Sequence, residues 1–173
     1  MIKKSLRFRS VKVKDFDSIL IVYNYYIKNS YSNFEEKKLK IDDFLLLYKE
    51  ISSLKLPFVV CEFNKTIVGF AYLNTFRKKS GYRYTFENTI YIHPKFIGKG
   101  IGSLLLRKLI EKSKKINKIK SIIAVIGEKN SKSSIKIHKK NGFKVVGKLK
   151  KVGYKKKQWV NTIYMQKIVN EKN

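Results

Sequence analysis

Three glycines stand between a predicted strand and a predicted helix in the middle of this 173-residue chain. The segment reads H-P-K-F-I-G-K-G-I-G-S-L-L-L-R-K-L-I over residues 93–110. Pro94 ends the strand because it cannot donate a hydrogen bond within a sheet. Gly98, Gly100 and Gly102 let backbone N–H groups gather around an anion, and the helix start adds partial positive charge. The segment predicts either an anion-binding loop or an ordinary glycine-rich turn.

The spacing of the glycines excludes two common phosphate-binding motifs. No G-K-[ST] ends the loop, as a P-loop requires, and the G-x-G-x-x-G spacing of a dinucleotide-binding turn is absent. An anion site here would therefore belong to another class of protein.

The remaining segments alternate between strand-like and helix-like patterns, without a repeat, a linker or a break in composition. We expect strands over residues 5–9, 56–63, 66–73, 82–92, 120–126, 143–151 and 158–168. We expect helices over residues 15–29, 41–54, from the glycine cluster to about residue 115, and over 132–140. This order and length predict one α/β domain over residues 1–173.

The chain is strongly basic, with 40 Lys and Arg against 12 Asp and Glu, a net charge of +28. Such a charge is typical of nucleic-acid binding. An AT-rich genome explains the charge as well. Lys, Ile and Asn have AT-rich codons and are abundant, whereas Arg and Pro have GC-rich codons and are scarce. The excess is Lys rather than Arg, the residue suited to reading bases. We therefore do not favour nucleic acid as a partner, although the charge leaves it open.

The chain has a single cysteine, Cys61, so no disulfide framework exists. Its apolar surroundings predict a buried, inert thiol rather than a nucleophile. No run of about 18 apolar residues and no signal-peptide pattern are found, so we expect a cytoplasmic protein away from membranes. No cluster of metal ligands is found, and we expect no metal.

The strand ending in I-x-P, followed by x-x-G-x-G and a helix, resembles motif A of the GNAT acetyltransferases. Four further blocks, in matching order, resemble the phosphinothricin acetyltransferase branch of that family. They read Y-N-Y-Y-I-K-N-S-Y-S-N-F-E-E, F-R-K-K-S-G-Y-R-Y-T-F-E-N-T-I-Y-I, A-V-I-G…N…S-I-K-I-H-K-K-N-G-F and V-G-Y-K-K-K-Q-W-V-N-T-I-Y-M-Q. The resemblance implies an α/β GNAT fold: a mixed, mostly antiparallel sheet of about seven strands flanked by about four helices.

The resemblance implies acetyl-CoA as co-substrate. The loop would hold its pyrophosphate through Ile97, Gly98, Lys99, Gly100, Ile101 and Gly102. Ile97 departs from the family, which has Gln or Arg there, but backbone donors would remain. The preceding strand would bind the pantetheine amides through Thr89, Ile90, Tyr91 and Ile92. Asn130 would also contact this arm. In the family this Asn stands one residue closer to the histidine that corresponds to His138, and in this chain Ser131 occupies that position.

Glu87 is the predicted general base. Strand alternation places it on one face with Thr85, Thr89 and Tyr91. An acceptor amine is protonated at neutral pH and must lose a proton before it attacks a thioester, and a nearby carboxylate can accept that proton. The family assigns this role to the matching Glu. The alternative is a strand Glu that faces solvent or pairs with a cation.

His138 occupies a position where the phosphinothricin branch also has His. The resemblance implies a leaving-group acid, a substrate contact, or part of a proton path with Glu87. A structural histidine is the alternative. On the acceptor side, the matching positions are Phe34, Arg77, Tyr82 and Arg83. An Arg there would bind a substrate carboxylate, whereas the alternative for both arginines is surface charge.

These observations predict an acetyl-CoA-dependent N-acetyltransferase that acts on the primary amine of a small amino acid or analogue, of the phosphinothricin or methionine sulfoximine type. A homodimer is implied by the resemblance alone, with Trp159 and Tyr164 as packing residues of the last hairpin. Two alternatives stay open. One is the same reaction on a protein N-terminus or a polyamine, and the other is a basic scaffold that binds RNA without catalysis.

Overall fold

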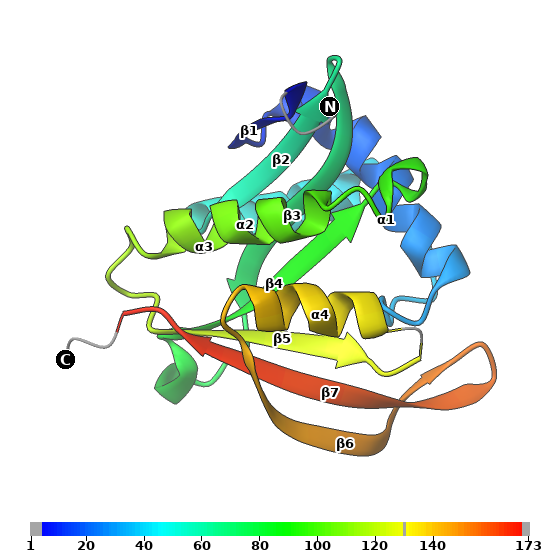
Figure 1. Ribbon diagram of the computed structural model, residues 1–173, viewed down its shortest axis with the longest axis vertical. Helices are drawn as coiled ribbons and strands as arrows, with labels where there is room; N and C mark the ends of the chain where they lie inside the picture. The colour runs from blue at the N-terminus through cyan, green and yellow to red at the C-terminus, as the bar shows by residue number, and fades with distance from the viewer. Residues whose placement is uncertain (1–4, 130, 171–173) are drawn as a thin grey trace.

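The computed structural model describes residues 5–129 and 131–170, which fold around a twisted seven-stranded sheet (Figure 1). The strands are β1 (Arg7–Ser10), β2 (Phe58–Phe63), β3 (Thr66–Thr75), β4 (Thr85–Ile92), β5 (Ser121–Gly127), β6 (Lys144–Lys155) and β7 (Gln158–Ile168). Their order across the sheet is β1-β2-β3-β4-β5-β7-β6. Within this described sheet, β4 and β5 run parallel and all other neighbours run antiparallel.

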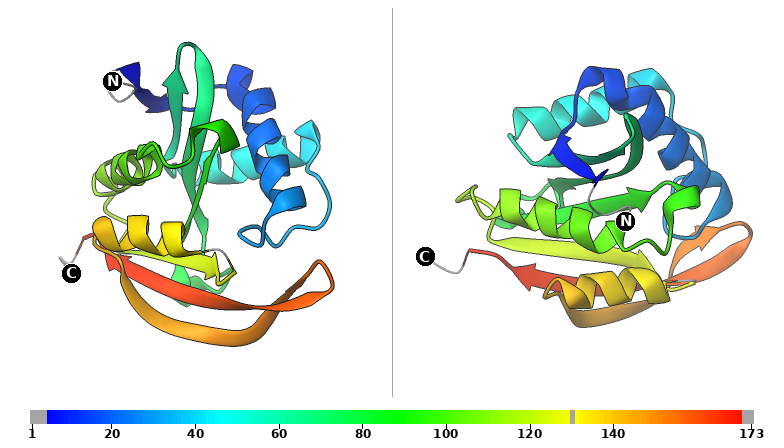
Figure 2. Two further views of the ribbon diagram at one scale, coloured as in Figure 1. Left: turned by 45° about the vertical axis from the view of Figure 1, so that its right-hand side comes forward. Right: turned by 45° about the horizontal axis from the view of Figure 1, so that its top comes forward.

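Four helices cover the two faces of the described sheet (Figure 2). They are α1 (Phe16–Asn29), α2 (Ile41–Ser53), α3 (Ile101–Ser113) and α4 (Lys132–Lys140). The first two pack against one face, and α3 and α4 pack against the other. None of the helices in the described residues is long and apolar enough to cross a membrane. The predicted mixed sheet of seven strands with four helices is confirmed.

Most expected boundaries agree with the structure to within two residues, and two strands differ by more. The strand expected over 82–92 begins only at Thr85, because Ser80–Tyr82 form a short 3-10 turn. The strand expected over 143–151 continues to Lys155, so the final hairpin is longer than its pattern indicates. Trp159 in that hairpin is 57% exposed and contacts Tyr154 rather than the core.

Aromatic side chains hold α1 and α2 on the sheet. Phe44 of α2 is fully buried, with its ring centroid 5.0 Å from that of Phe16 on α1 and 6.2 Å from that of Phe58 on β2. Edge-to-face pairs of this kind stabilise a core beyond the area they bury. The packing fixes both helices, and with them the connection over residues 30–40 that joins them.

The parallel pair β4 and β5 separates along its length. Three residue pairs join the two strands, and the last of them is Glu87 with Ile123. Beyond that point β4 stays paired with β3 up to Ile92, and β5 stays paired with β7 up to Gly127. Each strand is held by its outer neighbour, so an opening forms between them in the middle of the sheet.

The connection over residues 30–40 lies across the end of β5, close to the backbone. A Cβ atom on Gly127 would lie 2.2 Å from the carbonyl oxygen of Tyr31, so only glycine allows this approach. The hydroxyl of Tyr91 donates to the carbonyl of Ser32 at 3.1 Å. The ammonium of Lys155 donates to the carbonyl of Asn33. The connection is therefore anchored by the sheet and by the final hairpin.

We predict that Gly127→Ala lowers the free energy of unfolding by about 1–3 kcal/mol, because the added methyl group meets backbone and not a movable side chain. Gly147→Ala is the matched control: a Cβ there meets nothing within 4 Å, and a change within about 0.5 kcal/mol is expected. Urea unfolding of both variants measures the difference, and equal stabilities would contradict this account of the connection.

Candidate active site

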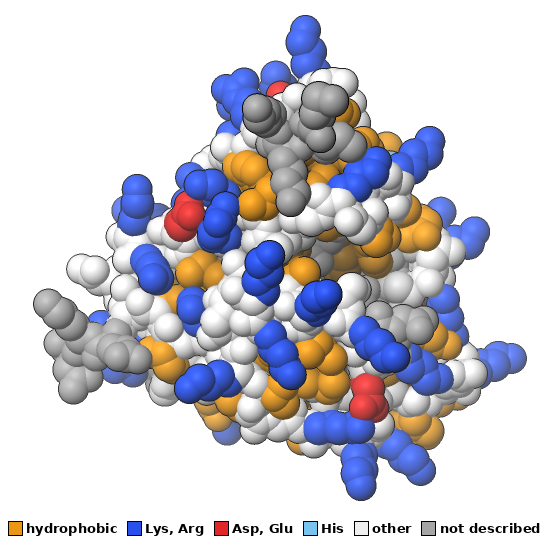
Figure 3. Space-filling model, in the orientation of Figure 1, with side chains coloured by type: hydrophobic (Ala, Val, Ile, Leu, Met, Phe, Trp, Pro, Cys, Tyr) orange, Lys and Arg blue, Asp and Glu red, His pale blue; other side chains and the backbone are white. Residues whose placement is uncertain are grey.

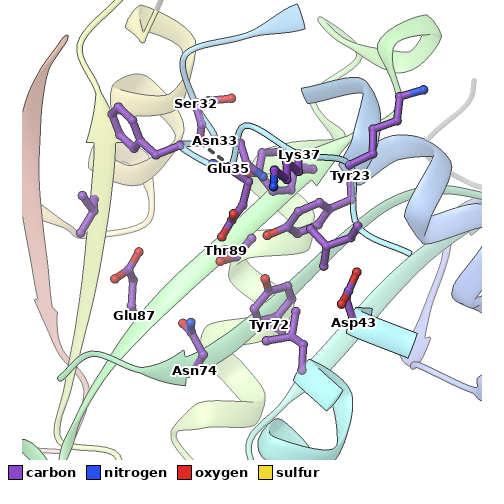
Figure 4. Close-up of a pocket in the computed structure, with 16 residues that line it drawn as sticks. Tyr23, Ser32, Asn33, Glu35, Lys37, Asp43, Tyr72, Asn74, Glu87 and Thr89 are labelled. Carbon is purple, nitrogen blue, oxygen red and sulfur yellow. Dashed lines mark hydrogen bonds between the residues drawn. The ribbon is translucent and has the colours of Figure 1, made fainter. Parts of the chain in front are cut away.

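A pocket of about 660 Å³ lies on the sheet face covered by α1 and α2 (Figure 4). Its walls come from α1, the 30–40 connection, α2 and the three central strands. The lining residues are Tyr23, Ser32, Asn33, Phe34, Glu35, Lys37, Lys38, Leu39, Asp43, Leu47, Tyr72, Asn74, Glu87, Thr89, Tyr91 and Val125. The pocket thus reaches from the surface to the point where β4 and β5 separate.

Glu87 is the carboxylate at the inner end of this pocket. It shares its strand face with Thr89 and Tyr91, and all three line the pocket. Burial raises the pKa of Glu87 from its ordinary 4.5 to about 7. Among the described residues it forms no ion pair, so the cation-paired alternative does not apply. A carboxyl group with a pKa near neutral is suited to exchange protons at physiological pH.

Hydroxyl and amide groups line the pocket around Glu87. Tyr72 on β3 is buried, and its hydroxyl has hydrogen-bonding partners in Thr89 and Tyr23. Burial raises the pKa of Tyr72 well above its ordinary value, so it stays a neutral phenol. Asn74, two residues further along β3, is the cross-strand neighbour of Glu87. Figure 4 shows the side chains of Asn74 and Glu87 turned toward the same space.

The glycine loop adopts the backbone shape that its sequence predicts. Gly98 and Gly100 have φ angles of 81° and 77°, which other residues adopt only with strain, and Gly100 is the N-cap of α3. Gly102 serves packing instead, because a Cβ there would lie 3.3 Å from Ile137 of α4. Ile97 is 56% exposed and leaves the loop open to solvent. The loop and the start of α3 therefore present amide groups that suit an anion.

The opening between β4 and β5 has the features needed by an extended ligand with amide groups. From Asn88 onward, the side of β4 that faces β5 lacks a strand partner within the described sheet. A strand edge of this kind binds extended chains through backbone hydrogen bonds. The carbonyl of Ile92 is already occupied, since it accepts from Tyr26 at 2.7 Å. Together with the glycine loop, this edge fits the pyrophosphate and amide-bearing arm of acetyl-CoA.

His138 lies on the opposite side of the sheet from Glu87. It is 1% exposed on α4, and its ring stacks edge-on against Phe143 at 5.0 Å. One ring nitrogen contacts the carbonyl of Ser134 at 2.8 Å and the other contacts the amide of Asn88 at 3.1 Å. Burial lowers the pKa of His138. A proton path from His138 to Glu87 finds no support here, because Asn88, which contacts His138, and Glu87 face opposite sides of β4. The role of His138 as an acid for the leaving group stays a prediction.

The sequence also predicts Phe34, Asn130 and Ser131 as site residues. Phe34 lines the pocket and packs against Gly153. Asn130 lies outside the described residues. Ser131 is buried as the N-cap of α4, and its hydroxyl donates to the carbonyl of Glu128 at 2.7 Å. Its hydroxyl therefore stabilises the entry to the helix.

Arg77, Tyr82 and Arg83 do not line the pocket in this chain. The guanidinium of Arg77 lies 5.9 Å from the ring centroid of Tyr82, and that of Arg83 lies 4.6 Å from the ring of Tyr84. Tyr82 is 41% exposed. The structure places all three on the β3–β4 connection, where the two guanidinium groups lie over aromatic rings at the surface, so their substrate role stays a prediction.

Sequence reasoning missed several of the lining residues, namely Tyr23, Asn33, Tyr72 and Asn74. Tyr72 and Asn74 stand two apart on β3, so alternation alone could have assigned them to one face. Their register against Glu87 could not be read from the sequence. For Cys61 the prediction is confirmed: it is buried, and burial raises its pKa to about 12.

Comparisons with known proteins agree with this geometry. The model of the acetyltransferase (GNAT) family matches residues 21–143, and the chain belongs to that family. The phosphinothricin N-acetyltransferase of Alcaligenes faecalis is 31% identical over 162 residues, which cover 94% of this chain and 82% of that protein. The L-methionine sulfoximine/L-methionine sulfone acetyltransferase of Salmonella typhimurium is 29% identical, covering 91% of each.

Solved structures show the same fold. The yncA protein of Salmonella typhimurium, solved with its cofactor acetyl-CoA, has a TM-score of 0.93 at 28% identity, covering 97% of this chain and 96% of that one. The phosphinothricin acetyltransferase of Sinorhizobium meliloti, in complex with acetyl-CoA, has a TM-score of 0.91 at 31% identity, covering 96% and 90%. The chain is thus a GNAT N-acetyltransferase resembling the phosphinothricin branch.

The raised pKa of Glu87 predicts how stability changes with pH. Its protonated form is favoured in the folded state, so its contribution is present below about pH 4.5 and is lost as the pH rises through about 7. Between about pH 5 and about pH 8, wild type should lose about 1–3 kcal/mol relative to Glu87→Gln. Denaturant unfolding at several pH values measures this, and parallel pH profiles would show that Glu87 is not desolvated.

Proposed function

We propose that this enzyme transfers an acetyl group from acetyl-CoA to the primary amine of a small amino acid or amino-acid analogue. One observation carries the proposal: Glu87, with a pKa of about 7, lies where the acceptor pocket meets the opening between β4 and β5. Both reactants can meet at that point without either passing through the core.

Glu87 performs the proton transfer in this proposal. An amine is protonated at neutral pH, and its nitrogen lone pair is available only after the proton has left. The ionised Glu87 carboxylate accepts that proton within the pocket. Acetyl-CoA supplies the activated acetyl group when it is bound. The tyrosine and threonine hydroxyls around Glu87 keep the site polar, while the surrounding burial keeps the basicity of Glu87 high.

The charge of the pocket favours an amine acceptor. The lining holds three carboxylates, Glu35, Asp43 and Glu87, against two lysines, Lys37 and Lys38. With Glu87 ionised, the lining carries one more negative than positive charge, in a chain whose net charge is +28. This excess lowers the repulsion that a cationic amine would otherwise meet. The two lysines offer partners for the carboxylate that an amino acid also carries.

The size of the pocket and the names of the relatives favour a small acceptor. A volume of about 660 Å³, bordered on one side by the 30–40 connection, suits an amino acid better than a folded polypeptide. Similar proteins are named for phosphinothricin, for methionine sulfoximine and sulfone, and for L-amino acids. Lysine and arginine side chains are scattered over the face shown in Figure 3 and do not follow one groove there, which gives RNA binding no support from that face.

We predict that Glu87→Gln lowers kcat by about 100- to 10,000-fold, the usual contribution of a general base. In wild type, kcat/KM should rise with pH through about 7, because the ionised form is active, and this limb should vanish in the variant. Free-thiol release with a fixed acceptor measures both effects. Glu111→Gln, an exposed change on α3, is the control and should match wild type.

An acceptor panel tests the substrate class. Acetylation should be fastest with free amino acids such as phosphinothricin, methionine sulfoximine and methionine sulfone, and at least about 10-fold slower with peptides or polyamines, because these fit a small pocket poorly. Preference for a peptide N-terminus or a polyamine would contradict this assignment of the acceptor while keeping the reaction.

A further inference from the structure

His138 and Asn88 form a buried pair whose contacts determine where the histidine proton lies. His138 Nδ1 is 2.8 Å from the carbonyl oxygen of Ser134. A carbonyl can only accept, so Nδ1 carries the ring proton. His138 Nε2, 3.1 Å from Asn88 Nδ2, therefore accepts a hydrogen bond in the neutral ring. Burial opposes the charged ring, which agrees with this tautomer.

This arrangement leaves His138 with no proton for a leaving group. Its single N–H is bound to the helix backbone, and its lone pair is bound to Asn88. What the ring does instead is to fix which way the Asn88 amide points. The amide nitrogen is held toward α4, so its oxygen must face elsewhere.

The Asn88 oxygen is the unused group of the pair. Asn88 is 7% exposed, and its Oδ1 is buried without a hydrogen-bond partner in the described structure. A buried acceptor without a donor is unfavourable, so an unfilled acceptor here points to a ligand. Asn88 is also the first residue of β4 beyond the last pair with β5, at the start of the opening.

The ligand that this opening fits offers the missing donors. The arm of CoA carries two amide N–H groups and ends in a thiol, and each of these can donate to an amide oxygen. Resting on the function proposed above, we propose that His138 is a positioning residue that orients the Asn88 amide, and that Asn88 Oδ1 accepts a hydrogen bond from the thiol-bearing arm of CoA. Glu87 would then act from one face of the sheet and Asn88 from the other.

The ligand-free protein tests the first half of the inference. Nitrogen NMR of the His138 ring should show a neutral imidazole with its proton on Nδ1 between about pH 6 and about pH 8. A proton on Nε2, or a doubly protonated ring in that range, would overturn the assignment. This measurement needs neither a variant nor a bound ligand.

Calorimetric binding of CoA tests the second half. Asn88→Leu, which removes the oxygen but keeps the volume, should weaken the Kd for CoA by about 10-fold, as expected for one lost neutral hydrogen bond. His138→Ala should weaken it similarly, and the double variant should be no weaker than either single one. His138→Gln should stay within about 3-fold of wild type, because its amide oxygen can accept from Asn88. Lys139→Ala, exposed on α4, is the control.

The outcomes separate this inference from the proposed function. If wild type fails to bind CoA, both are overturned. If wild type binds CoA and Asn88→Leu binds it equally well, only this inference fails. His138 would instead be the acid under one outcome. His138→Gln would then turn over as slowly as His138→Ala, and both variants would lack a fall in rate at alkaline pH that wild type shows. If His138→Ala does not fold, Asn88→Leu and the nitrogen spectrum still decide the question.

Discussion

The separation of β4 from β5 organises the whole site. The two strands share three residue pairs and then follow different neighbours, β3 and β7. A continuous sheet would have satisfied its backbone groups internally and left no entry for a ligand. The opening instead brings three elements to one place: the glycine loop after β4, the Glu87 pocket on one face, and the His138–Asn88 pair on the other.

Burial gives the site its chemistry. Asp15, Glu62, Glu111 and Glu128 pair with cations in the described structure. Glu87 instead lines the pocket between the central strands and the 30–40 connection, and burial raises its pKa to about 7. That connection stays in place because Gly127 allows the backbone of Tyr31 to approach and because Tyr91 and Lys155 bind its carbonyls. These contacts hold in place the connection that forms one wall of the pocket around Glu87.

Local patterns predicted the fold and part of the site. Apolar patterns and turn residues predicted the seven strands and four α-helices of the described residues but not the short 3-10 turns, and alternation along β4 placed Glu87 with Thr89 and Tyr91. What local patterns could not predict depends on contacts between distant segments. The register that sets Asn74 beside Glu87, and the partners of His138, follow from packing that spacing does not encode. Arg77 and Arg83 match the family in position, but here they stack on neighbouring aromatic rings.

In the complex with CoA, the opening between β4 and β5 should receive the arm of CoA, and a crystal structure of that complex is the direct test. We expect the arm to lie between the two strands, with its amides bonded to the β4 backbone beyond Glu87 and the pyrophosphate on the loop from Ile97 to Gly102. CoA bound on the lysine-rich surface, with β4 and β5 free of it, would show that the opening is not the CoA site.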